Sequence, residues 1–377
     1  MSLFLLVAGD FAETGGMDRA NFALAGYLAD RGDEVHLVTH RAAAELRERP
    51  NVYEHAAPKP LDSYFLGAPW LDYLGRYHAR RIAARGGRVV VNGGNCIWGD
   101  VNWVHYVHAS HVPQSRAHAA HALKTYLHHR RSLDREAAAL RCARVIIANS
   151  ERTRRDLVEK VGVDEGRART VYLGIDSEQF RPPKAGEQRQ IRLCFGWRLQ
   201  ATKIAFIGGL GDRRKGFDTV FEAWRRLNGR PEWKADLVVM GRGAELPGWK
   251  RRVAAEGLSD QVEFLGFRND IPRVLAACDL VVAPTRYEPY GLAVQEALAM
   301  GIPAVVTRSA GIAEHYRAEL QELLLNDPEN PVELAERLGH WRRNRSRFEQ
   351  PLARLSAELR LHSWTRMAEQ MVKCITV

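Results

Sequence analysis

Residues 286–301 read Arg286-Tyr-Glu-Pro-Tyr-Gly-Leu-Ala-Val-Gln-Glu-Ala-Leu-Ala-Met300-Gly301. The apolar run 280–283 precedes them and is typical of a buried strand, which a Pro-Thr pair ends. Pro289 and Gly291 mark a turn, and residues 292–300 have the pattern of a helix. The sequence therefore predicts a strand, a tight loop and the start of a helix.

The same segment places one carboxylate on each side of its turn. Glu288 lies in the loop and Glu296 in the second helical turn. Backbone N–H groups around Gly291 are expected to form an anion site, and a glycine lets a phosphate approach closely. Glu296 can accept hydrogen bonds from ribose hydroxyls and Glu288 from a sugar ring. The pattern suits a nucleotide-sugar; the alternative is two ordinary surface carboxylates.

This segment resembles the Glu-x7-Glu motif of the retaining family-4 glycosyltransferases, also called glycosyl transferases group 1. The resemblance implies an α/β fold of the GT-B type, with two facing Rossmann-like, doubly wound parallel-sheet domains and a C-terminal helix that returns to the N-terminal domain. It also implies a hexosyltransferase-type enzyme. The donor-binding positions that it assigns here are Glu288, Tyr290, Gly291, Leu292 and Glu296, and Glu288 is also assigned a catalytic role.

Length and composition fit two globular domains. A chain of 377 residues with 46% hydrophobic residues is long for a single core. We expect an acceptor-side domain over 1–182, joined by a helix at about 360–377, and a nucleotide-sugar domain over 183–359. Pro182 to Gly186 forms a natural linker.

Cysteine usage and hydropathy predict the cellular compartment of the protein. The five cysteines are scattered without a Cys-x-x-Cys pair, which favours a reducing compartment over a disulfide framework or zinc site. The apolar start, Ser2 to Gly9, is short and resembles a first strand more than a signal peptide. No apolar run reaches membrane-spanning length. A cytoplasmic protein is expected.

The formal net charge of +10 is concentrated locally. Residues 111–155 hold ten Lys and Arg against three Asp and Glu, a net +7, and five of the fourteen histidines. This stretch is either a solvated helix face or a surface for an anionic partner. We favour a peripheral role on the inner face of a membrane, and we expect no nucleic-acid partner because no nucleic-acid motif is present.

The N-terminal half opens with a predicted βαβ unit. Residues 3–8 and 34–39 have strand patterns, with a helix over 19–30 between them. By the family resemblance, Gly15 and Gly16 face the donor phosphates and the acceptor, although a plain helix cap explains them nearly as well. Residues 50–70 show no clear period, and the following helix is predicted only over 76–84.

Several histidines follow the next strands, in the run Trp103-Val-His105-Tyr-Val-His108-Ala-Ser-His111. The alternation places His105 on the opposite face from its neighbours, and His108 at the end of the strand. Family members often carry a histidine at this position, so His108 is the candidate catalytic residue and His105 the second choice. A metal site is not expected, because no carboxylate or cysteine stands at ligand spacing nearby.

A second glycine turn lies in the C-terminal half, Gly208-Gly-Leu-Gly-Asp-Arg-Arg-Lys215-Gly216. It lacks the Gly-Lys-Ser/Thr of a Walker loop, and basic residues occupy it. Guanidinium and ammonium groups beside backbone N–H groups suit a diphosphate. The resemblance assigns Gly209, Arg214 and Lys215 to the donor phosphates, the last two also as catalytic residues, and Phe267 to the nucleotide base.

The resulting hypothesis is a retaining glycosyltransferase that moves a sugar from a nucleotide-diphosphate sugar to a glycan or lipid-linked acceptor, in cell-surface polysaccharide or glycolipid synthesis. The basic turn can replace a divalent metal, so neither a metal nor another cofactor is expected. A GT-B sugar-nucleotide epimerase or phosphorylase is the alternative among enzymes, although the Arg-Lys-Gly and Glu-x7-Glu motifs argue against both. A nucleic-acid-binding protein is the alternative outside enzymes.

Overall fold

The computed structural model describes residues 2–114, 119–211 and 213–376. Residues 115–118 of the basic stretch and Asp212 of the second glycine turn lie outside them. The described chain forms two compact units. The first comprises Met1–Val112, Lys124–Gly174 and His362–Val377, and the second Pro113–Leu123 and Ile175–Leu361.

The first unit is built on a parallel sheet of seven strands among the described residues. Their spatial order, β5-β3-β1-β6-β7-β8-β9, reverses direction between β1 and β6, as in doubly wound folds. A short parallel pair of β2 (Asp10–Phe11) and β4 (Arg41–Ala42) lies apart from this sheet. The seven strands are β1 (Leu3–Val7), β3 (Glu34–Thr39), β5 (Val52–Ala56), β6 (Arg88–Asn92), β7 (Val101–Val104), β8 (Val145–Ala148) and β9 (Ala168–Thr170).

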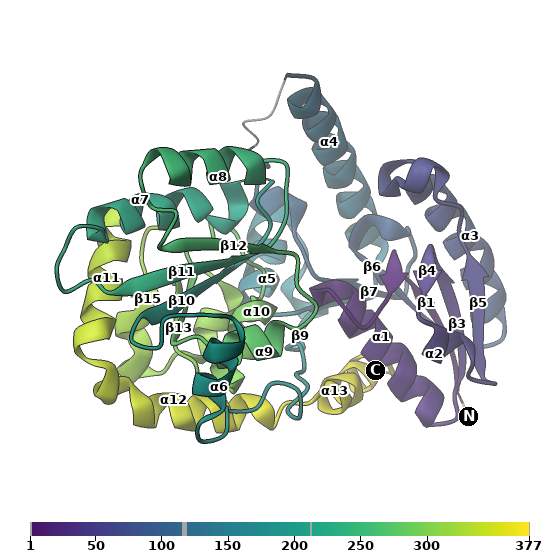
Figure 1. The fold of residues 1–377 in the computed structure, drawn as a ribbon. Helices are drawn as coiled ribbons and strands as arrows, with labels where there is room; N and C mark the ends of the chain where they lie inside the picture. Colours follow the sequence, from purple (N-terminus) through teal and green to yellow (C-terminus); the bar gives the residue numbers. More distant parts are fainter. Residues whose placement is uncertain (1, 115–118, 212, 377) are drawn as a thin grey trace. The chain divides into compact units, whose positions relative to one another are not determined.

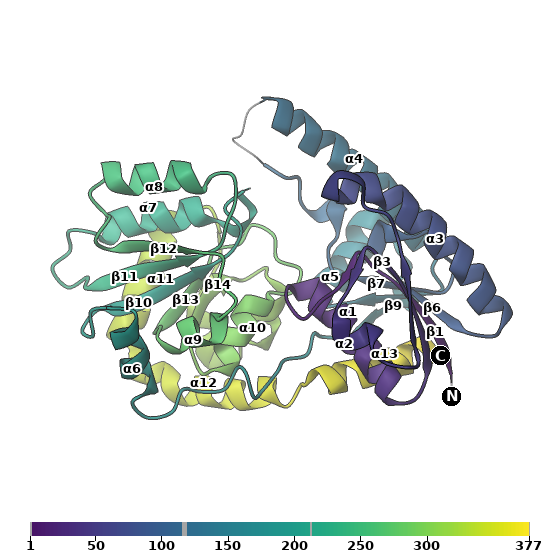
Figure 2. The same cartoon turned by 45° about the vertical axis from the view of Figure 1, so that its right-hand side comes forward.

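Helices cover this sheet because its strands are apolar on both faces. Leu5 and Val7 point toward α3, where they share a buried cluster with Leu71 and Ile82. The alternate residues face the other side, where α13 packs against α1 (Figures 1 and 2). The helices of this unit are α1 (Gly16–Asp30), α2 (Ala44–Arg47), α3 (Tyr64–Ala84), α4 (Ala119–Cys142), α5 (Glu151–Asp156) and α13 (Trp364–Thr376).

The second unit repeats the doubly wound plan. Its parallel sheet has the order β12-β11-β10-β13-β14-β15 over the described residues, and the order reverses between β10 and β13. The strands are β10 (Thr202–Ile207), β11 (Ala235–Met240), β12 (Val262–Gly266), β13 (Leu280–Ala283), β14 (Ala304–Thr307) and β15 (Leu324–Leu325). In Figure 1, α7 and α8 cover one face and α9, α10 and α12 the other. The helices are α6 (Glu187–Cys194), α7 (Phe217–Leu227), α8 (Leu246–Ala255), α9 (Ile271–Ala276), α10 (Leu292–Ala299), α11 (Pro331–Arg343) and α12 (Arg345–Arg360).

The predicted α/β fold with doubly wound parallel sheets is confirmed, including the C-terminal helix in the first unit. Three local predictions are corrected. The segment 50–70 holds β5 and the start of α3, which begins twelve residues before the predicted position. Helix α1 starts at Gly16 instead of residue 19. Strand β7 ends at Val104, so His105 follows the strand and does not alternate within it.

Candidate active site

The two loops of the second unit that carry the predicted phosphate- and sugar-binding residues follow neighbouring strands. β10 and β13 pair directly where the strand order reverses, and their carboxyl ends lie at the same edge. Ligands of doubly wound sheets bind in the crevice at this position, because the loops diverge there to opposite faces. The glycine turn after β10 and the loop 284–291 after β13 are therefore brought together by topology.

Three of the predicted residues converge at this edge. The ammonium group of Lys215 forms an ion pair with the Glu288 carboxylate. The guanidinium of Arg214 lies 3.8 Å from the same carboxylate oxygen and donates a 3.0 Å hydrogen bond to the carbonyl of Tyr287. All three side chains are partly buried, with 13–22% of each exposed. Two cations thus share one carboxylate at a partly accessible site.

Backbone contact holds the two loops in register. The backbone N–H of Arg286 donates to the carbonyl of Arg214 at 2.8 Å. Gly216 has φ of 74°, and a Cβ built on it would lie 2.0 Å from the carbonyl oxygen of Pro284. Only glycine fits at such an approach.

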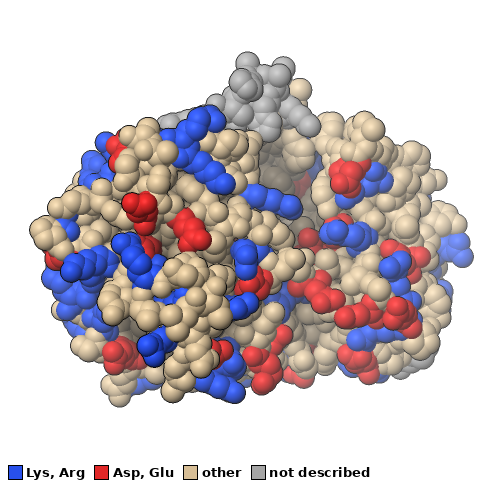
Figure 3. Space-filling view, viewed as in Figure 1, with Lys and Arg blue, Asp and Glu red and all other residues tan. Residues whose placement is uncertain are grey.

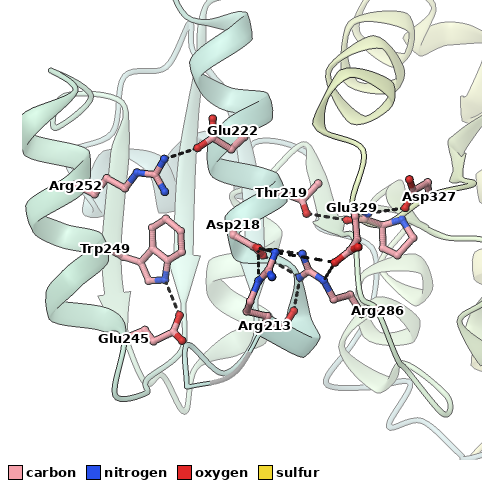
Figure 4. Close-up of polar contacts among 11 residues, drawn as sticks. Arg213, Asp218, Thr219, Glu222, Glu245, Trp249, Arg252, Arg286, Asp327 and Glu329 are labelled. Carbon is pink, nitrogen blue, oxygen red and sulfur yellow. Dashed lines mark hydrogen bonds and ion pairs between the residues drawn. The ribbon is translucent and has the colours of Figure 1, made fainter. Parts of the chain in front are cut away.

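A network of ion pairs joins the two loops to helix α7, as Figure 4 shows. Arg286 donates to both carboxylate oxygens of Asp218 at 2.9 Å and to Glu329 at 2.7 Å. Arg213 donates to Asp218 at 2.8 Å. Burial by itself would raise the pKa of Asp218, but the hydrogen bonds from the two arginines outweigh it and lower the pKa. No local sequence pattern indicates this pairing, because Asp218 and Arg286 are 68 residues apart.

The start of α10 follows the loop directly. Gly291 occupies the N-cap with φ of 113°, and a Cβ there would lie 2.9 Å from Ile312. Helix α10 has no acidic residue in its first turn and no side-chain cap, so its first N–H groups favour an anion. Tyr290 is buried and Leu292 partly buried. Glu296 lies, partly buried, in the second turn.

The remaining predicted donor positions of this unit follow β10 and β12. Gly209 is exposed, and the nearest atom to a Cβ built on it is 4.0 Å away. Its surroundings therefore leave open space at the turn. Phe267 follows β12 with 57% of its surface exposed, and the guanidinium of Arg242 lies 4.7 Å from its ring centroid.

In the first unit, Gly15 and Gly16 form the entrance to α1. Gly15 is the N-cap, with φ of 90°, and Gly16 is the first helical residue. Nearby, burial raises the pKa of Asp18 to about 6, helped by repulsion from Asp10 and opposed by Arg41. The first turn of α1 therefore carries a carboxyl group with a pKa of about 6.

Asp10 anchors the neighbourhood of that loop. Its buried carboxylate accepts hydrogen bonds from Arg41 and from the Tyr64 hydroxyl, each at 2.7 Å. These three residues come from β2, β4 and α3. The sequence did not indicate this cluster, since residues 50–70 showed no period that would have placed Tyr64.

His108 lies in a short 3₁₀ turn, His108–Ser110, beyond the carboxyl end of β7. Its Nδ1 is 2.9 Å from a carboxylate oxygen of Glu136, and its backbone N–H donates to both oxygens at 3.0 and 3.1 Å. Glu136 is buried on α4. A carboxylate at Nδ1 fixes the ring orientation and directs Nε2 outward from the pair. By contrast, burial lowers the pKa of His105 to about 3, so it stays neutral.

The described residues also bear on metal binding and on membrane spans. No group of three or more His, Cys, Asp or Glu side chains there is arranged to hold a metal ion. Within the same ranges, no helix combines the length and hydropathy needed to cross a bilayer.

Comparison with known families matches both halves of the chain. The family described as "Glycosyltransferase Family 4" matches residues 14–179, and the family described as "Glycosyl transferases group 1" matches residues 201–344. Together these matches take in the second sheet with the loops after β10 and β13, and the first sheet except β1.

Individual relatives are distant. The mannosylfructose-phosphate synthase of Agrobacterium fabrum is 29% identical over 58% of this chain, which spans half of that relative's length. The D-inositol 3-phosphate glycosyltransferase of Salinispora tropica is 25% identical over 96% of this chain and 80% of its own. The crystal structure of HepE from Anabaena in complex with UDP and glucose has a TM-score of 0.70 at 18% identity, covering 100% of this chain and 99% of HepE. That similarity shows a shared fold.

Proposed function

Because the chain belongs to family 4 of the glycosyltransferases, we propose that it transfers a hexosyl group from a nucleotide-diphosphate sugar to an acceptor hydroxyl with retention of anomeric configuration. The observation that carries this proposal is the convergence of Arg214, Lys215 and Glu288 where the strand order reverses. The proposed acceptor is a glycan or a lipid-linked molecule of cell-surface polysaccharide or glycolipid synthesis.

The two cations bind the diphosphate. As the bond from the sugar C1 to the phosphate oxygen breaks, negative charge grows on the leaving group. Arg214 and Lys215 stabilise that charge, together with the first N–H groups of α10 after Gly291. Donors of this kind are worth about 3–4 kcal/mol of transition-state stabilisation in other enzymes. This clamp needs no divalent metal.

The two carboxylates bind hydroxyls. Glu288, held between the cations, accepts hydrogen bonds from the sugar ring. Glu296 on α10 accepts them from the ribose. Phe267 and Gly209 complete the donor site: the exposed ring of Phe267 lies against the base, and the open turn at Gly209 admits the phosphates. HepE, whose structure contains UDP, supports a nucleotide diphosphate as the ligand.

The acceptor binds on the first unit, at the loop of Gly15 and Gly16 and at His108. His108 is a positioned hydrogen-bond donor or base, because Glu136 fixes its ring through Nδ1. We propose that Nε2 contacts the reacting sugar or the acceptor hydroxyl. Relatives named for inositol 3-phosphate and mannosylfructose phosphate make small phosphorylated acceptors a necessary part of any substrate panel.

The basic stretch 111–155 is the proposed contact with an anionic membrane at the inner face. Several of its arginines are paired internally, among them Arg135, Arg144 and Arg154. On the face in Figure 3, basic and acidic side chains are interspersed. The proposal therefore depends on α4, where Tyr126 and Leu127 are more than half exposed beside the exposed Arg130. Apolar side chains next to cations suit a membrane interface.

Activity with a panel of nucleotide-sugars and acceptors tests the function. We expect release of nucleoside diphosphate that depends on acceptor, and a product with the donor's anomeric configuration by NMR. Lys215→Met should lower kcat by about a hundredfold, whereas Lys234→Met, an exposed lysine of the same unit, should not. Turnover without acceptor, or an inverted product, would contradict the proposal.

A further inference from the structure

The second unit holds a pocket of about 430 Å³ on the side away from the candidate active site. Asp279, which precedes β13, and Pro303, which precedes β14, line it, and α12 forms its wall with Arg345 and Leu352. These positions lie at the amino ends of β13 and β14, whereas the active-site loop of β13 follows its carboxyl end. The four residues of β13 alone span about 13 Å. The pocket is therefore a separate site.

The pocket lining contains two carboxylates, Asp279 and the exposed Glu349, and an arginine, Arg345, that is not ion-paired to either of them. Arg345 donates a 2.5 Å hydrogen bond to the Thr202 hydroxyl, and its guanidinium lies 4.4 Å from the centroid of the Trp341 ring. Among the described residues, no carboxylate lies within ion-pair distance of Arg345. Asp279, also in the wall, is already bound by Arg192 at 2.7 Å and by the backbone N–H of Lys203 at 2.7 Å.

The surrounding sequence adds positive charge. The junction between α11 and α12 reads Trp341-Arg-Arg-Asn-Arg-Ser-Arg347. Helix α12 has no acidic residue in its first turn and no capping side chain, so its positive end is not compensated. Arg342 does not line the pocket, because its guanidinium lies over the Trp233 ring, 5.5 Å from the ring centroid. Burial lowers the pKa of Arg345, and repulsion from Arg342 and Arg192 adds to this effect while attraction to Asp279 opposes it.

The rest of the wall is largely apolar. Met300, Pro303, Leu352 and the Trp341 ring contribute hydrocarbon surface. A second arginine, Arg360, borders the other end, but fifteen residues of α12 separate it from Arg345, about 22 Å along the axis. One small anion can therefore contact only one of them. Arg345 is the better placed, because Thr202 and Trp341 hold its guanidinium.

We propose that this pocket binds a small organic anion, a carboxylate or phosphate group on an apolar body, and that Arg345 binds the anionic group while Trp341 and Leu352 contact the body. A guanidinium forms paired hydrogen bonds with either head group. The proposal does not depend on the enzyme's reaction, since none of these residues belongs to the candidate active site.

Calorimetric titration of the full chain with phenyl phosphate and, separately, benzoate tests the proposal. Each titration is run with and without excess UDP, because a phosphate probe can also bind at Arg214 and Lys215. We expect at least one probe to bind equally in both conditions. Arg345→Met should weaken that binding about tenfold or more, the effect of losing a charged hydrogen bond. Arg354→Met, at an exposed position of α12 outside the pocket, is the matched control.

A second variant distinguishes loss of the binding site from a loss of folding stability caused by the Arg345 substitution. Ala353 is exposed and lines the pocket, so Ala353→Phe should fold normally and obstruct the site. It should abolish probe binding while leaving UDP binding unchanged. Failure of both probes to bind the wild-type chain would overturn the proposal. So would unchanged affinity in both the Arg345→Met and Ala353→Phe variants, and so would full competition by UDP, which would assign the probe to the donor site.

Discussion

Gly216 is the residue at which the two loops of the candidate donor site meet. Because Gly216 has no Cβ, the turn after β10 can approach the carbonyl of Pro284. A Cβ at this position would lie 2.0 Å from that carbonyl oxygen. The convergence of Lys215 with Glu288 depends on this contact, because residues 215 and 216 are adjacent. A phosphate-binding role for the glycine is therefore unnecessary to explain its presence; a structural reason suffices.

Gly216→Ala should destabilise the second unit severely. The substitution combines a left-handed backbone, at about 1–2 kcal/mol, with overpacking against carbonyl backbone, for about 3 kcal/mol or more in total. Gly229→Ala is the control: its φ of 86° is also positive, but nothing lies within 4 Å of a Cβ there. Urea unfolding should show a loss of only about 1–2 kcal/mol for that variant, the cost of the left-handed backbone alone. Equal losses would contradict the steric account.

Asp18 predicts a dependence of stability on pH in the first unit. Its pKa of about 6 exceeds the ordinary value of 3.8, so the folded state binds this proton more tightly than the unfolded chain does. The free energy of unfolding should therefore fall as pH rises from about 4 to about 6, and then level off. Because Asp18 is partly exposed, we expect a loss on the order of 1–2 kcal/mol.

The Asp18→Asn variant isolates this effect. The difference in unfolding free energy between the variant and the wild type should change across that pH window and stay constant above it. A difference that does not depend on pH would show that the Asp18 carboxyl does not bind a proton preferentially in the folded state.

At the scale of elements, a charged network ties helix α7 to the loop after β13. Arg286 is 9% exposed and Asp218 14%, so both oxygens of one carboxylate bind a largely buried guanidinium. Asp218 is in the first turn of α7, where a carboxylate also suits the helix dipole. The position of the loop after β13 is therefore fixed by its ion pair with helix α7.

Asp218→Asn should lower the free energy of unfolding by about 2–4 kcal/mol, because it leaves Arg286 buried with a weaker partner. Since the pKa of Asp218 is lowered, the wild-type advantage should exist above the ordinary pKa of an aspartate and disappear as pH falls through the folded value. Glu329→Gln is the control. That carboxylate is 56% exposed, so its loss should cost less than about 1 kcal/mol. If Asp218→Asn and Glu329→Gln had the same denaturant midpoint, the stabilising role of the Asp218–Arg286 pair would be refuted.

Elements with a strong pattern could be predicted from the sequence. The apolar runs of β3 and β13 have the predicted bounds. Helix α3 could not be found in its first twelve residues, because Pro69 and several exposed aromatic side chains obscure its apolar face. Its burial against β1 and β3 is a tertiary effect that a local pattern does not contain.

For the candidate site too, only the features with a local sequence pattern could be predicted. Glycine turns and charged residues after strands led to the prediction that Arg214, Lys215 and Glu288 lie together, because the carboxyl ends of parallel strands share an edge. Their supports were not predictable. Glu136, which holds His108, and Asp218, which holds Arg286, are brought to their partners by folding across 28 and 68 residues.

At the scale of the whole molecule, each unit has its own doubly wound sheet and its own core. The last helix, α13, belongs to the first unit although it follows the second in sequence. Met371 of α13 is fully buried, and α13 packs against α1. The stability of the first unit therefore depends on the final residues of the chain.

Met371→Ala should destabilise the first unit by about 2–5 kcal/mol, as for other large-to-small core substitutions. We expect calorimetry to show a lowered transition for the first unit and an unchanged one for the second. Lys373→Ala, at an exposed position of the same helix, should change neither. A shift confined to the second unit's transition would contradict the assignment of α13.

The central claim is that the second unit binds a nucleoside diphosphate at the loops after β10 and β13. The most direct test is differential scanning calorimetry of the wild-type chain and of Lys215→Met and Glu296→Ala, with a panel of nucleoside diphosphates and their sugars. A hundredfold excess over Kd should stabilise the second unit by about 2.7 kcal/mol. We predict a rise in that unit's transition with one base, reduced in both variants. No rise with any nucleotide, or a rise that both variants retain in full, would contradict the account.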